Sequence, residues 1–585
     1  MDLLRIEPLL QERLPRLYDS LPTFLREPLL HLLDRFLRLP DMRTFFSAHG
    51  HRRGLDILDE ALDRLGVWAS FSLRDRARIP HEGRLVVVAN HPLGGLDGLV
   101  LLRTLLDVRP DVKVVANDLL MAFPGLREYF LPYDIFSRKP QRSNLEAIAR
   151  ALENDEAVIF FPAAEVARLT WRGIRERKWH PGPVHFARKH GAPVLPVYIE
   201  GRNSWLFYLS ALFSRPLSMF LLPREMFGRR GRSIAIKIGD PIPAASLGTA
   251  ALREKALTDL LQKHLYRLGE GRKGFFRTES CIIHPVERRA LRRELGNAQI
   301  LGQTYDGKRI FLADGTFKVT LREIARLREA TFRKVGEGTG SRLDLDAYDG
   351  HYHHLVLWDD AEMEIVGAYR LGLCSDILAR HGQQGLYAAS LFHFSPTFSA
   401  LLPDAAELGR SFVQPRYWNS RALDYLWMGI GAFLARRPAL RWLYGCVSIS
   451  NTYPEPAKDL LVHFYRTWFG GEEGLAVSHH PYPLSKIRRT ELERLFPGTD
   501  YRVEARRLKE QLKHYGCTVP TLYKQYAELC EPGGVKFLDF GVDHGFGNCV
   551  DGLILVDVSR ITAEKRARYL DPAFVEPSPA GEAVS

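Results

Sequence analysis

The chain has 585 residues, of which 46% are hydrophobic and 26% charged, which excludes a disordered chain and exceeds the size of one ordinary domain. An excess of 81 Lys and Arg over 69 Asp and Glu gives a formal net charge of +12. This charge favours an acidic partner such as anionic lipid, an acidic carrier protein or nucleic acid. The six cysteines have neither the density of a disulfide framework nor metal-site spacing, which predicts a reducing, cytosolic environment.

The first 80 residues carry leucines at helical spacing with basic residues between them, as in FLREPLLHLLDRFLRL at 24–39. They predict an amino-terminal helical region over 1–80 that packs on the adjoining domain, with a membrane-facing role as the alternative. The charges that interrupt the first 22 residues are not typical of a signal peptide.

An alternation of apolar strands and helices begins near residue 84. This alternation predicts an α/β domain with a mostly parallel sheet over 81–270. Within it, SWLFYLSALFSRPLSMFLLP at 204–223 is long enough to raise the question of a transmembrane helix, but Arg215 and Pro216 oppose one. Its aromatic residues suit a segment in the membrane interface, and two buried core helices are the alternative.

The pattern changes after residue 270. The segment 271–296 mixes glycine, charge and proline without a sustained period and is predicted to be a linker. A strand, a helix and a run of central strands with a helix behind them predict a second, α+β domain over 297–562. Residues 563–585 are polar and contain proline, which predicts a disordered tail.

A histidine ends the first strand of the α/β domain, in VVVANHPLGGLDGLVLL at 86–102. His91 therefore lies at the carboxyl edge of a sheet, where such folds place reacting groups, and an aspartate such as Asp97 can fix the tautomer of a histidine base. Gly94 and Gly95 let the backbone approach a substrate, and the amino terminus of the next helix suits an oxyanion or a phosphate. A satisfied structural histidine is the alternative for an isolated residue of this kind.

Three ordered segments carry a family resemblance. NHPLGGLDG resembles the Asn-His-x-x-x-x-Asp motif of the glycerolipid (lysophosphatidic acid) acyltransferases, in the form of their haemolysin-like and ornithine-lipid branch. VIFFPAAEVARL at 158–169 resembles the acceptor-binding block of that family, with Glu165 as its acidic member, and APVLPVYIEGRNS resembles its late Val-Pro-Val strand. The resemblance covers about residues 80–245.

The resemblance implies that His91 takes a proton from an acceptor hydroxyl, which attacks an acyl thioester without a metal or another cofactor. Five residues separate His91 from Asp97 instead of the usual four, so the Gly94-Gly95 turn must absorb one residue if the two side chains are to touch. Ala-Ala-Glu in place of Glu-Gly argues against a phosphate-bearing glycerolipid acceptor. Arg168 is a candidate for binding an anionic acceptor group or the phosphopantetheine of a carrier, and a solvated face is its alternative.

Segments of the second domain carry a resemblance of their own. LREIARLREATF, ELGRSFVQPRYW and ALDYLWMGIGAFL resemble the N-acyltransferase that makes lyso-ornithine lipid, a relative of the N-acetyltransferase (GNAT) and acyl-homoserine-lactone synthase folds. The resemblance implies direct attack of an amine on an acyl thioester. Glu407 and Arg410 are candidates for contacting the oppositely charged parts of one amino acid, and an ordinary ion pair is the alternative. Arg370 is a candidate for thioester or carrier binding and Asp349 for engaging the amine, whereas His353 and His354 stay unassigned.

Together the two domains resemble the bifunctional ornithine lipid synthases. That resemblance implies N-acylation of ornithine by 3-hydroxyacyl-acyl carrier protein in the carboxyl-terminal domain, followed by O-acylation of the lyso-lipid hydroxyl by acyl-acyl carrier protein in the amino-terminal domain. The implied partners are acyl carrier protein, ornithine and the anionic inner face of a bacterial inner membrane, with no nucleic acid. The alternatives are a synthase for a glycine or glutamine lipid, and a single O-acyltransferase with a non-catalytic GNAT-like docking module.

Overall fold

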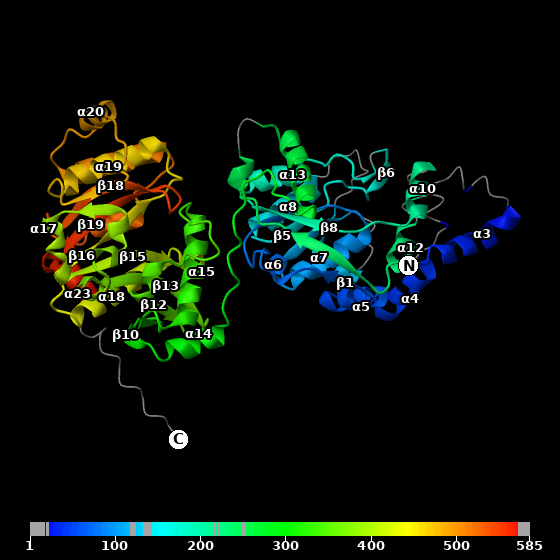
Figure 1. Ribbon diagram of the computed structural model, residues 1–585, viewed down its shortest axis with the longest axis horizontal. Coiled ribbons are helices and arrows are strands. Elements are labelled where there is room, and N and C mark those ends of the chain that lie inside the picture. Colours follow the sequence, from blue (N-terminus) through cyan, green and yellow to red (C-terminus); the bar gives the residue numbers. More distant parts are fainter. Residues whose placement is uncertain are drawn as a thin grey trace, which may run out of the picture. The chain divides into compact units, whose positions relative to one another are not determined.

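The computed structural model describes residues 7, 18, 23–116, 124–132, 142–171, 173–213, 218, 221–248 and 252–570. The chain divides into two compact units, Met1–His284 and Pro285–Ser585 (Figure 1). The division falls inside the segment 271–296 that the sequence assigns to a linker.

Three helices open the amino unit, α3 (Thr23–Phe36), α4 (Leu39–His49) and α5 (Leu55–Leu65). Leucines of α3 and α4 share an apolar cluster with Phe207 and Tyr208, which lie in α10 (Trp205–Phe213). The apolar face of α5 packs into the core beside the central sheet. The leucine spacing of this region therefore marks faces that are buried within the unit.

The central sheet of the amino unit has seven strands in the order β1-β9-β8-β2-β5-β3-β4. All neighbours run parallel except β8 and β9, so the mostly parallel sheet predicted from the sequence is confirmed. The strands are β1 (Val67–Ser70), β2 (Leu85–Ala89), β3 (Val112–Ala116), β4 (Phe130–Pro132), β5 (Ala157–Phe160), β8 (Val194–Ile199) and β9 (Arg232–Ile238).

Helices cover both faces of this sheet. In β2, alternate residues face two different apolar layers, one formed with α5 and α7 (Gly95–Leu106) and the other with α8 (Arg142–Glu153), α9 (Gly182–Lys189) and α13 (Glu254–Gly269). Burial on both faces explains why β2 has a continuous apolar sequence, as parallel strands do. The smaller elements are α6 (Leu73–Arg76), η3 (Pro124–Tyr129), β6 (Arg168–Thr170), β7 (Gly173–Arg175), α12 (Leu222–Phe227) and η4 (Ala244–Leu247).

The apolar passage 204–223 contains α10 and the start of α12, while Arg215 and Pro216 lie outside the described residues. In α10, Phe207 and Tyr208 are buried, whereas Trp205, Leu209 and Leu212 are exposed. Among the residues that the structure describes, no helix has both the length and the apolar character needed to cross a membrane.

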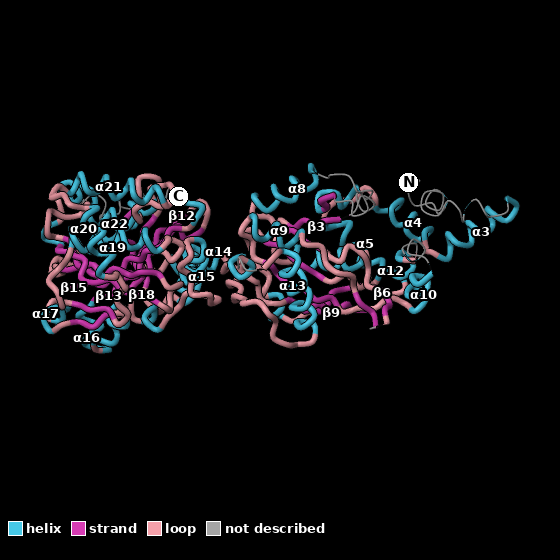
Figure 2. Tube along the Cα trace, turned by 90° about the horizontal axis from the view of Figure 1, so that it is seen from above, coloured by secondary structure: helices cyan, strands magenta, loops and turns pink. Residues whose placement is uncertain are grey.

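The carboxyl unit is built on an eight-stranded sheet in the order β10-β11-β12-β13-β15-β16-β19-β18. Its neighbours are antiparallel except β15 and β16, and helices flank the strands on both sides (Figure 2). The α+β arrangement predicted for this part of the chain is confirmed. The strands are β10 (Gln299–Gln303), β11 (Arg309–Ala313), β12 (His353–Asp359), β13 (Glu364–Leu373), β15 (Ala405–Val413), β16 (Trp442–Ile449), β18 (Val535–Asp543) and β19 (Cys549–Asp557).

Different helices pack on the two faces of the eight-stranded sheet. One face carries a single large apolar core formed with α18 (Ala422–Ala435), α19 (Glu455–Phe469), α21 (Tyr501–His514) and α22 (Thr521–Ala527). The other face carries two apolar clusters, one with α14 (Arg288–Leu295) and α15 (Lys318–Lys334), the second with α16 (Cys374–His381) and α17 (Pro396–Ser399). The remaining described elements are η5 (Ala347–Gly350), η6 (Gln383–Gly385), η7 (Ala388–Ser390), β14 (Phe392–Phe394), η8 (Leu402–Asp404), η9 (Pro415–Tyr417), β17 (Ala476–Ser478), α20 (Lys486–Leu495), η10 (Val558–Arg560) and α23 (Ala563–Tyr569).

Three sequence predictions need correction here. The single strand predicted at the start of the second domain is the antiparallel hairpin of β10 and β11. The predicted linker contains α14, because Leu291 and Leu295 bury one side of this otherwise basic helix. The predicted disordered tail begins with α23, where the Tyr569 hydroxyl donates to Asp424 at 3.1 Å; residues 571–585 lie outside the described residues.

Candidate active sites

His91 and Asp97 meet at the carboxyl end of β2. His91 Nδ1 lies 3.1 Å from Asp97 Oδ2, which also accepts from the backbone N–H groups of Leu93 at 2.7 Å and Gly94 at 3.0 Å. Gly94 adopts φ +82°, and a Cβ there would lie 3.0 Å from Leu222. This left-handed turn absorbs the fifth intervening residue, so the longer spacing still brings the pair together.

The two side chains of this pair differ in exposure. The His91 side chain is 18% exposed, while that of Asp97 is fully buried. Burial raises the pKa of Asp97, and His91 and the two backbone donors oppose that shift. With Nδ1 turned to Asp97, Nε2 of the imidazole is the nitrogen left for a substrate proton.

Neighbouring residues hold the backbone at this strand end. The Asn90 side chain accepts from Ile199 N at 2.7 Å and donates to Ile199 O at 2.8 Å, which ties β2 to β8. Glu176 accepts from the backbone N–H of His91 and from Trp179 Nε1, the latter at 2.9 Å, and burial raises its pKa. Glu176 is a positioning residue that sequence reasoning missed, because IRERKWH has the composition of a polar surface segment.

Glu165 lies in an ion-pair network beside this strand end. Its carboxylate is 3.0 Å from Arg168 and 3.4 Å from Arg177, and its side chain is only 18% exposed. The backbone N–H of Ala167, next to Arg168, donates to His91 O at 3.1 Å. The structure therefore places the predicted Glu165 and Arg168 close to His91, with their charges engaged by each other. Gly95, at the first position of α7, has room for a Cβ 3.8 Å from Met226.

A row of charged residues crosses the sheet of the carboxyl unit between the two apolar clusters of one face. On β13, β15 and β19 in turn, these residues are Arg370, Arg410 and Asp551. Arg370 is 1% exposed and Asp551 5% exposed. Charged groups this deeply buried require partners or a ligand, so the row marks a candidate site.

The backbone opens at the same place. β15 and β16 pair only over Ala405–Glu407 and Trp442–Tyr444. Gly445 follows, and a Cβ on it would lie 1.9 Å from Leu408 O, so only glycine permits the last close approach of the two strands. Arg410 adopts φ +49° at a register shift of β15, where an extra residue turns its side chain to the same face as Glu407.

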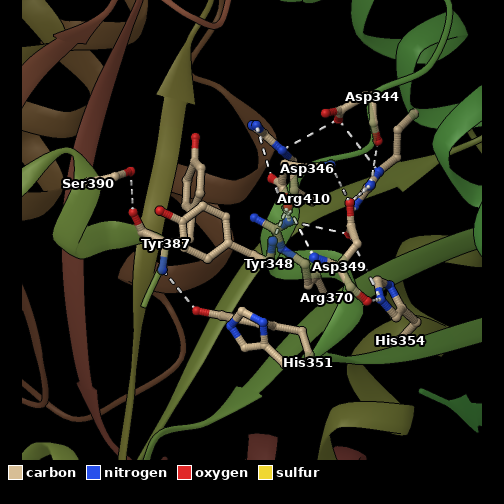
Figure 3. Close-up of polar contacts among 12 residues, drawn as sticks. Asp344, Asp346, Tyr348, Asp349, His351, His354, Arg370, Tyr387, Ser390 and Arg410 are labelled. Carbon is tan, nitrogen blue, oxygen red and sulfur yellow. Dashed lines mark hydrogen bonds and ion pairs between the residues drawn. The ribbon is translucent and has the colours of Figure 1, made fainter. Parts of the chain in front are cut away.

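Three arginines and three aspartates form a buried network on this face, shown in part in Figure 3. Arg328 donates both terminal nitrogens to Asp349, at 2.9 and 2.7 Å. Arg370 Nη1 donates to both oxygens of Asp346 at 2.7 Å and to Asp349 at 3.3 Å. The remaining members are Asp344 and Arg410, which lie 3.4 Å apart.

The network determines which groups remain free. Arg328 and Arg370 hold the pKa of Asp349 well below its usual range in spite of burial, and they occupy its oxygens. Asp349, predicted to engage the amine, is thus held in this ion-pair network in the structure. Nε and Nη2 of Arg370 are buried without a hydrogen-bond acceptor among the described residues, beside the ring of Tyr387 at 5.0 Å. Burial lowers the pKa of the neighbouring His354 to about 4, which leaves it neutral.

Glu407 is buried under four donors on the same face. Its carboxylate accepts from the hydroxyls of Tyr352 at 2.5 Å and Tyr444 at 3.4 Å, and from the backbone N–H groups of Tyr387 at 3.1 Å and Ala388 at 2.6 Å. Burial raises its pKa, and these donors oppose the shift. Glu407 and Arg410 do not pair with each other, and each lies against the segment that carries Tyr387.

Three more buried carboxylates lie beside Arg410: Glu337, Asp543 and Asp551. Burial raises the pKa of Asp551 to about 7, with repulsion from Asp543 and Glu337 adding to the shift. Burial also raises the pKa of Glu337 to about 7. Sequence reasoning missed this group, since Glu337 lies far along the chain from the paired strands β18 and β19 that carry Asp543 and Asp551.

Because the pKa of Asp551 is raised, ionisation of this carboxyl group is expected to lower the stability of the folded protein as the pH rises. The folded protein binds the Asp551 proton more tightly than the unfolded chain does. The contribution of this proton to the free energy of unfolding is complete below about pH 4 and is lost as the pH rises to about 7. Asp551→Asn has no carboxyl group to ionise at this position. We expect its free energy of unfolding to match that of the wild type near pH 4 and to be about 2–4 kcal/mol higher at pH 8. Urea unfolding at several pH values measures the difference, and parallel curves for both proteins would contradict it.

Comparison with known proteins finds a separate family match in each of the two units. A family described as "Acyltransferase" matches residues 9–272, and one described as "Acetyltransferase (GNAT) domain" matches residues 327–428. A glycine N(alpha)-acyltransferase of Phocaeicola vulgatus is 30% identical over 313 residues, which cover 51% of this chain and 94% of that protein.

Two further relatives are named for other activities. A lyso-glycine lipid O-acyltransferase of Bacteroides thetaiotaomicron is 28% identical over 249 residues, 41% of this chain and 89% of that protein. An L-ornithine N(alpha)-acyltransferase of Agrobacterium fabrum is 29% identical over 285 residues, 45% of this chain and 88% of that protein. The fold and the matched domains define an acyltransferase with a GNAT domain. The chain belongs to the family of the glycine N(alpha)-acyltransferases.

Proposed function

We propose that the chain is a bifunctional amino-acid lipid synthase that N-acylates ornithine in its carboxyl unit and O-acylates the resulting lyso-lipid in its amino unit. The observation that carries the proposal is that each unit contains its own group suited to accepting a proton, the partly exposed His91 in one and the buried Glu407 in the other. Relatives named as N-acyltransferases and as O-acyltransferases each match about half of the chain, as two successive acylations require.

In the amino unit, His91 Nε2 takes the proton of the lyso-lipid hydroxyl. The alkoxide oxygen attacks the thioester carbonyl carbon, the carbon–sulfur bond breaks, and the proton passes to the departing thiolate. Asp97 fixes the tautomer and stabilises the imidazolium formed during the step. Glu165 and Arg168 line the acceptor side of this site through their contacts beside His91.

In the carboxyl unit, the neutral α-amine of the amino acid attacks the thioester carbonyl of a 3-hydroxyacyl group. Glu407 receives the proton that the amine loses, the carbon–sulfur bond breaks to give an amide, and the proton passes to the departing thiolate, which leaves as a thiol. The free donors of Arg370, together with Arg410, bind the carboxylate of the amino acid. Tyr387 lies against both guanidinium groups, so its ring is placed beside the bound carboxylate.

The proposed acyl donor and the proposed location in the cell rest on the net charge of the chain and on its exposed apolar residues. A net charge of +12 suits acidic acyl carrier proteins and the anionic inner face of a bacterial membrane. The exposed Trp205, Leu209 and Leu212 of α10 suit shallow contact with that surface. Covalent connection of the two units raises the effective concentration of the lyso-lipid for the second acylation.

Expression in a bacterium that lacks aminolipids, followed by mass spectrometry of its lipids, tests the proposal. We expect a diacylated ornithine lipid, with the amide-linked 3-hydroxyacyl group esterified by a second chain. A glycine lipid in its place would favour the acceptor named for the Phocaeicola vulgatus relative. Absence of any aminolipid, with O-acylation of a supplied lyso-lipid, would instead identify the carboxyl unit as a docking module.

A further inference from the structure

Glu337, Asp543 and Asp551 gather on one side of Arg410. Asp551 of β19 lies directly opposite Ser448 of β16, and Asp543 ends the neighbouring strand β18. Glu337 follows α15 and packs on the β18–β19 loop, where a Cβ on Gly547 would lie 3.1 Å from its Cα. The three carboxylates, named here the acidic cluster, are 5–8% exposed.

The acidic cluster carries more negative than positive charge, because its neighbour Arg410 already pairs with Asp344 and Asp346. The three aspartates of the adjoining network are matched by its three arginines, Arg410 among them. Within the described part of the chain, none of Glu337, Asp543 and Asp551 forms an ion pair with lysine or arginine. Asp551 accepts only from the weak thiol donor of Cys549, at 3.7 Å, among the hydrogen bonds that the described residues make. The raised pKa values of Asp551 and Glu337 agree with this shortage of paired positive charge.

At the other end of this group lies the Arg370 guanidinium, whose Nη1 donates to Asp346 and Asp349. Arg370 is 1% exposed, with two donors that lack acceptors among the described residues. Tyr387 connects the two ends, because its ring lies 5.0 Å from the Arg370 guanidinium and its hydroxyl donates to Asp543 at 3.2 Å. A ligand that fits has a carboxylate for Arg370 and a cation for the carboxylates.

An ammonium group other than the reacting amine meets this requirement for a cation. Among the described residues, no group of three acidic, histidine or cysteine side chains is arranged to hold a metal ion. An amine held between carboxylates keeps its proton and cannot attack a thioester, so the acylated amine must be a second one. We propose that the acidic cluster binds the side-chain ammonium of a diamino acid, and so selects ornithine over glycine or glutamine. This inference rests on the proposed function.

Competition between acceptors in the full chain tests the inference. The purified protein is given 3-hydroxyacyl-acyl carrier protein with ornithine, glycine or glutamine, and kcat and KM are measured for each amide. We expect the wild type to prefer ornithine. In Asp551→Asn, we expect the ratio of kcat/KM for ornithine to that for glycine to fall about tenfold to a hundredfold, mainly through KM for ornithine. Glu337→Gln is expected to change the ratio in the same direction.

Asp557→Asn is the matched control. Asp557 is a buried carboxylate of the same strand, but it caps Ser559 at the far end of β19. The control is expected to keep the wild-type ratio. Thermal unfolding with each amino acid gives a second readout: ornithine, and not glycine, should raise the midpoint of the wild type, and this difference should disappear in Asp551→Asn.

The outcomes separate the two proposals. Equal use of glycine and ornithine by the wild type would overturn the inference while leaving an amino-acid N-acyltransferase. An equal loss with every acceptor in Asp551→Asn would also overturn it, and would indicate that Asp551 takes part in proton transfer. If the wild type acylates none of these amino acids although it is folded and loaded donor is present, the proposed function itself fails and the inference fails with it.

Discussion

Replacing His91 with alanine is expected to lower O-acylation of lyso-lipid by about 10²–10⁴-fold and to leave amide synthesis unchanged. Nε2 is the nitrogen positioned to take the hydroxyl proton, and alanine offers no base in its place. The loss should appear in kcat, since the side chain acts on the reacting proton. Lipid extracts of cells with the variant should accumulate the monoacylated lyso-lipid.

Two further variants make the result specific. His185→Ala removes an exposed histidine of the same unit, paired with Glu254 on the surface, and should retain full O-acylation. Asp97→Asn keeps an oxygen that can accept from Leu93 and Gly94 but removes the charge facing His91, so we expect an intermediate loss. Diacyl lipid at wild-type levels from His91→Ala would show that His91 is a structural residue.

Local pattern predicted the position of His91 well. An apolar run that ends in Asn-His, followed by glycines and an apolar helix, fixes a strand end and a helix start within a few residues. The contact between His91 and Asp97 depends on the φ of Gly94, which sequence spacing alone leaves undetermined. Glu176 escaped prediction because its role comes from one hydrogen bond to a backbone group 85 residues away in the chain.

The second site was harder to predict for a related reason. Glu407 and Arg410 are close in sequence, but a register shift in β15 decides which way Arg410 points. Asp551 reaches the site through the pairing of β19 with β16, a partnership between segments about a hundred residues apart. The helices α14 and α23 were missed because short amphipathic segments rich in arginine resemble linkers until a core covers one side.

Replacing Glu407 with glutamine is expected to lower N-acylation by about 10²–10⁴-fold and to destabilise the carboxyl unit by about 1–3 kcal/mol. Glutamine has nearly the same shape as glutamate but keeps only one of its two oxygens. In the wild type a backbone N–H group donates to each oxygen of the carboxylate. One of these N–H groups would then face the side-chain NH₂, so a buried donor loses its acceptor.

Tyr352→Phe separates proton transfer from positioning at this residue. It removes one donor to the carboxylate but keeps the carboxylate itself, which still accepts from the N–H groups of Tyr387 and Ala388. If Glu407 takes the proton, Tyr352→Phe keeps substantial kcat and shifts the acid limb of its pH profile, since a donor that lowers the pKa of Glu407 is gone. O-acylation of supplied lyso-lipid should persist in both variants. Equal losses of kcat and of unfolding midpoint in the two variants would instead make Glu407 a positioning residue for the Tyr387 segment.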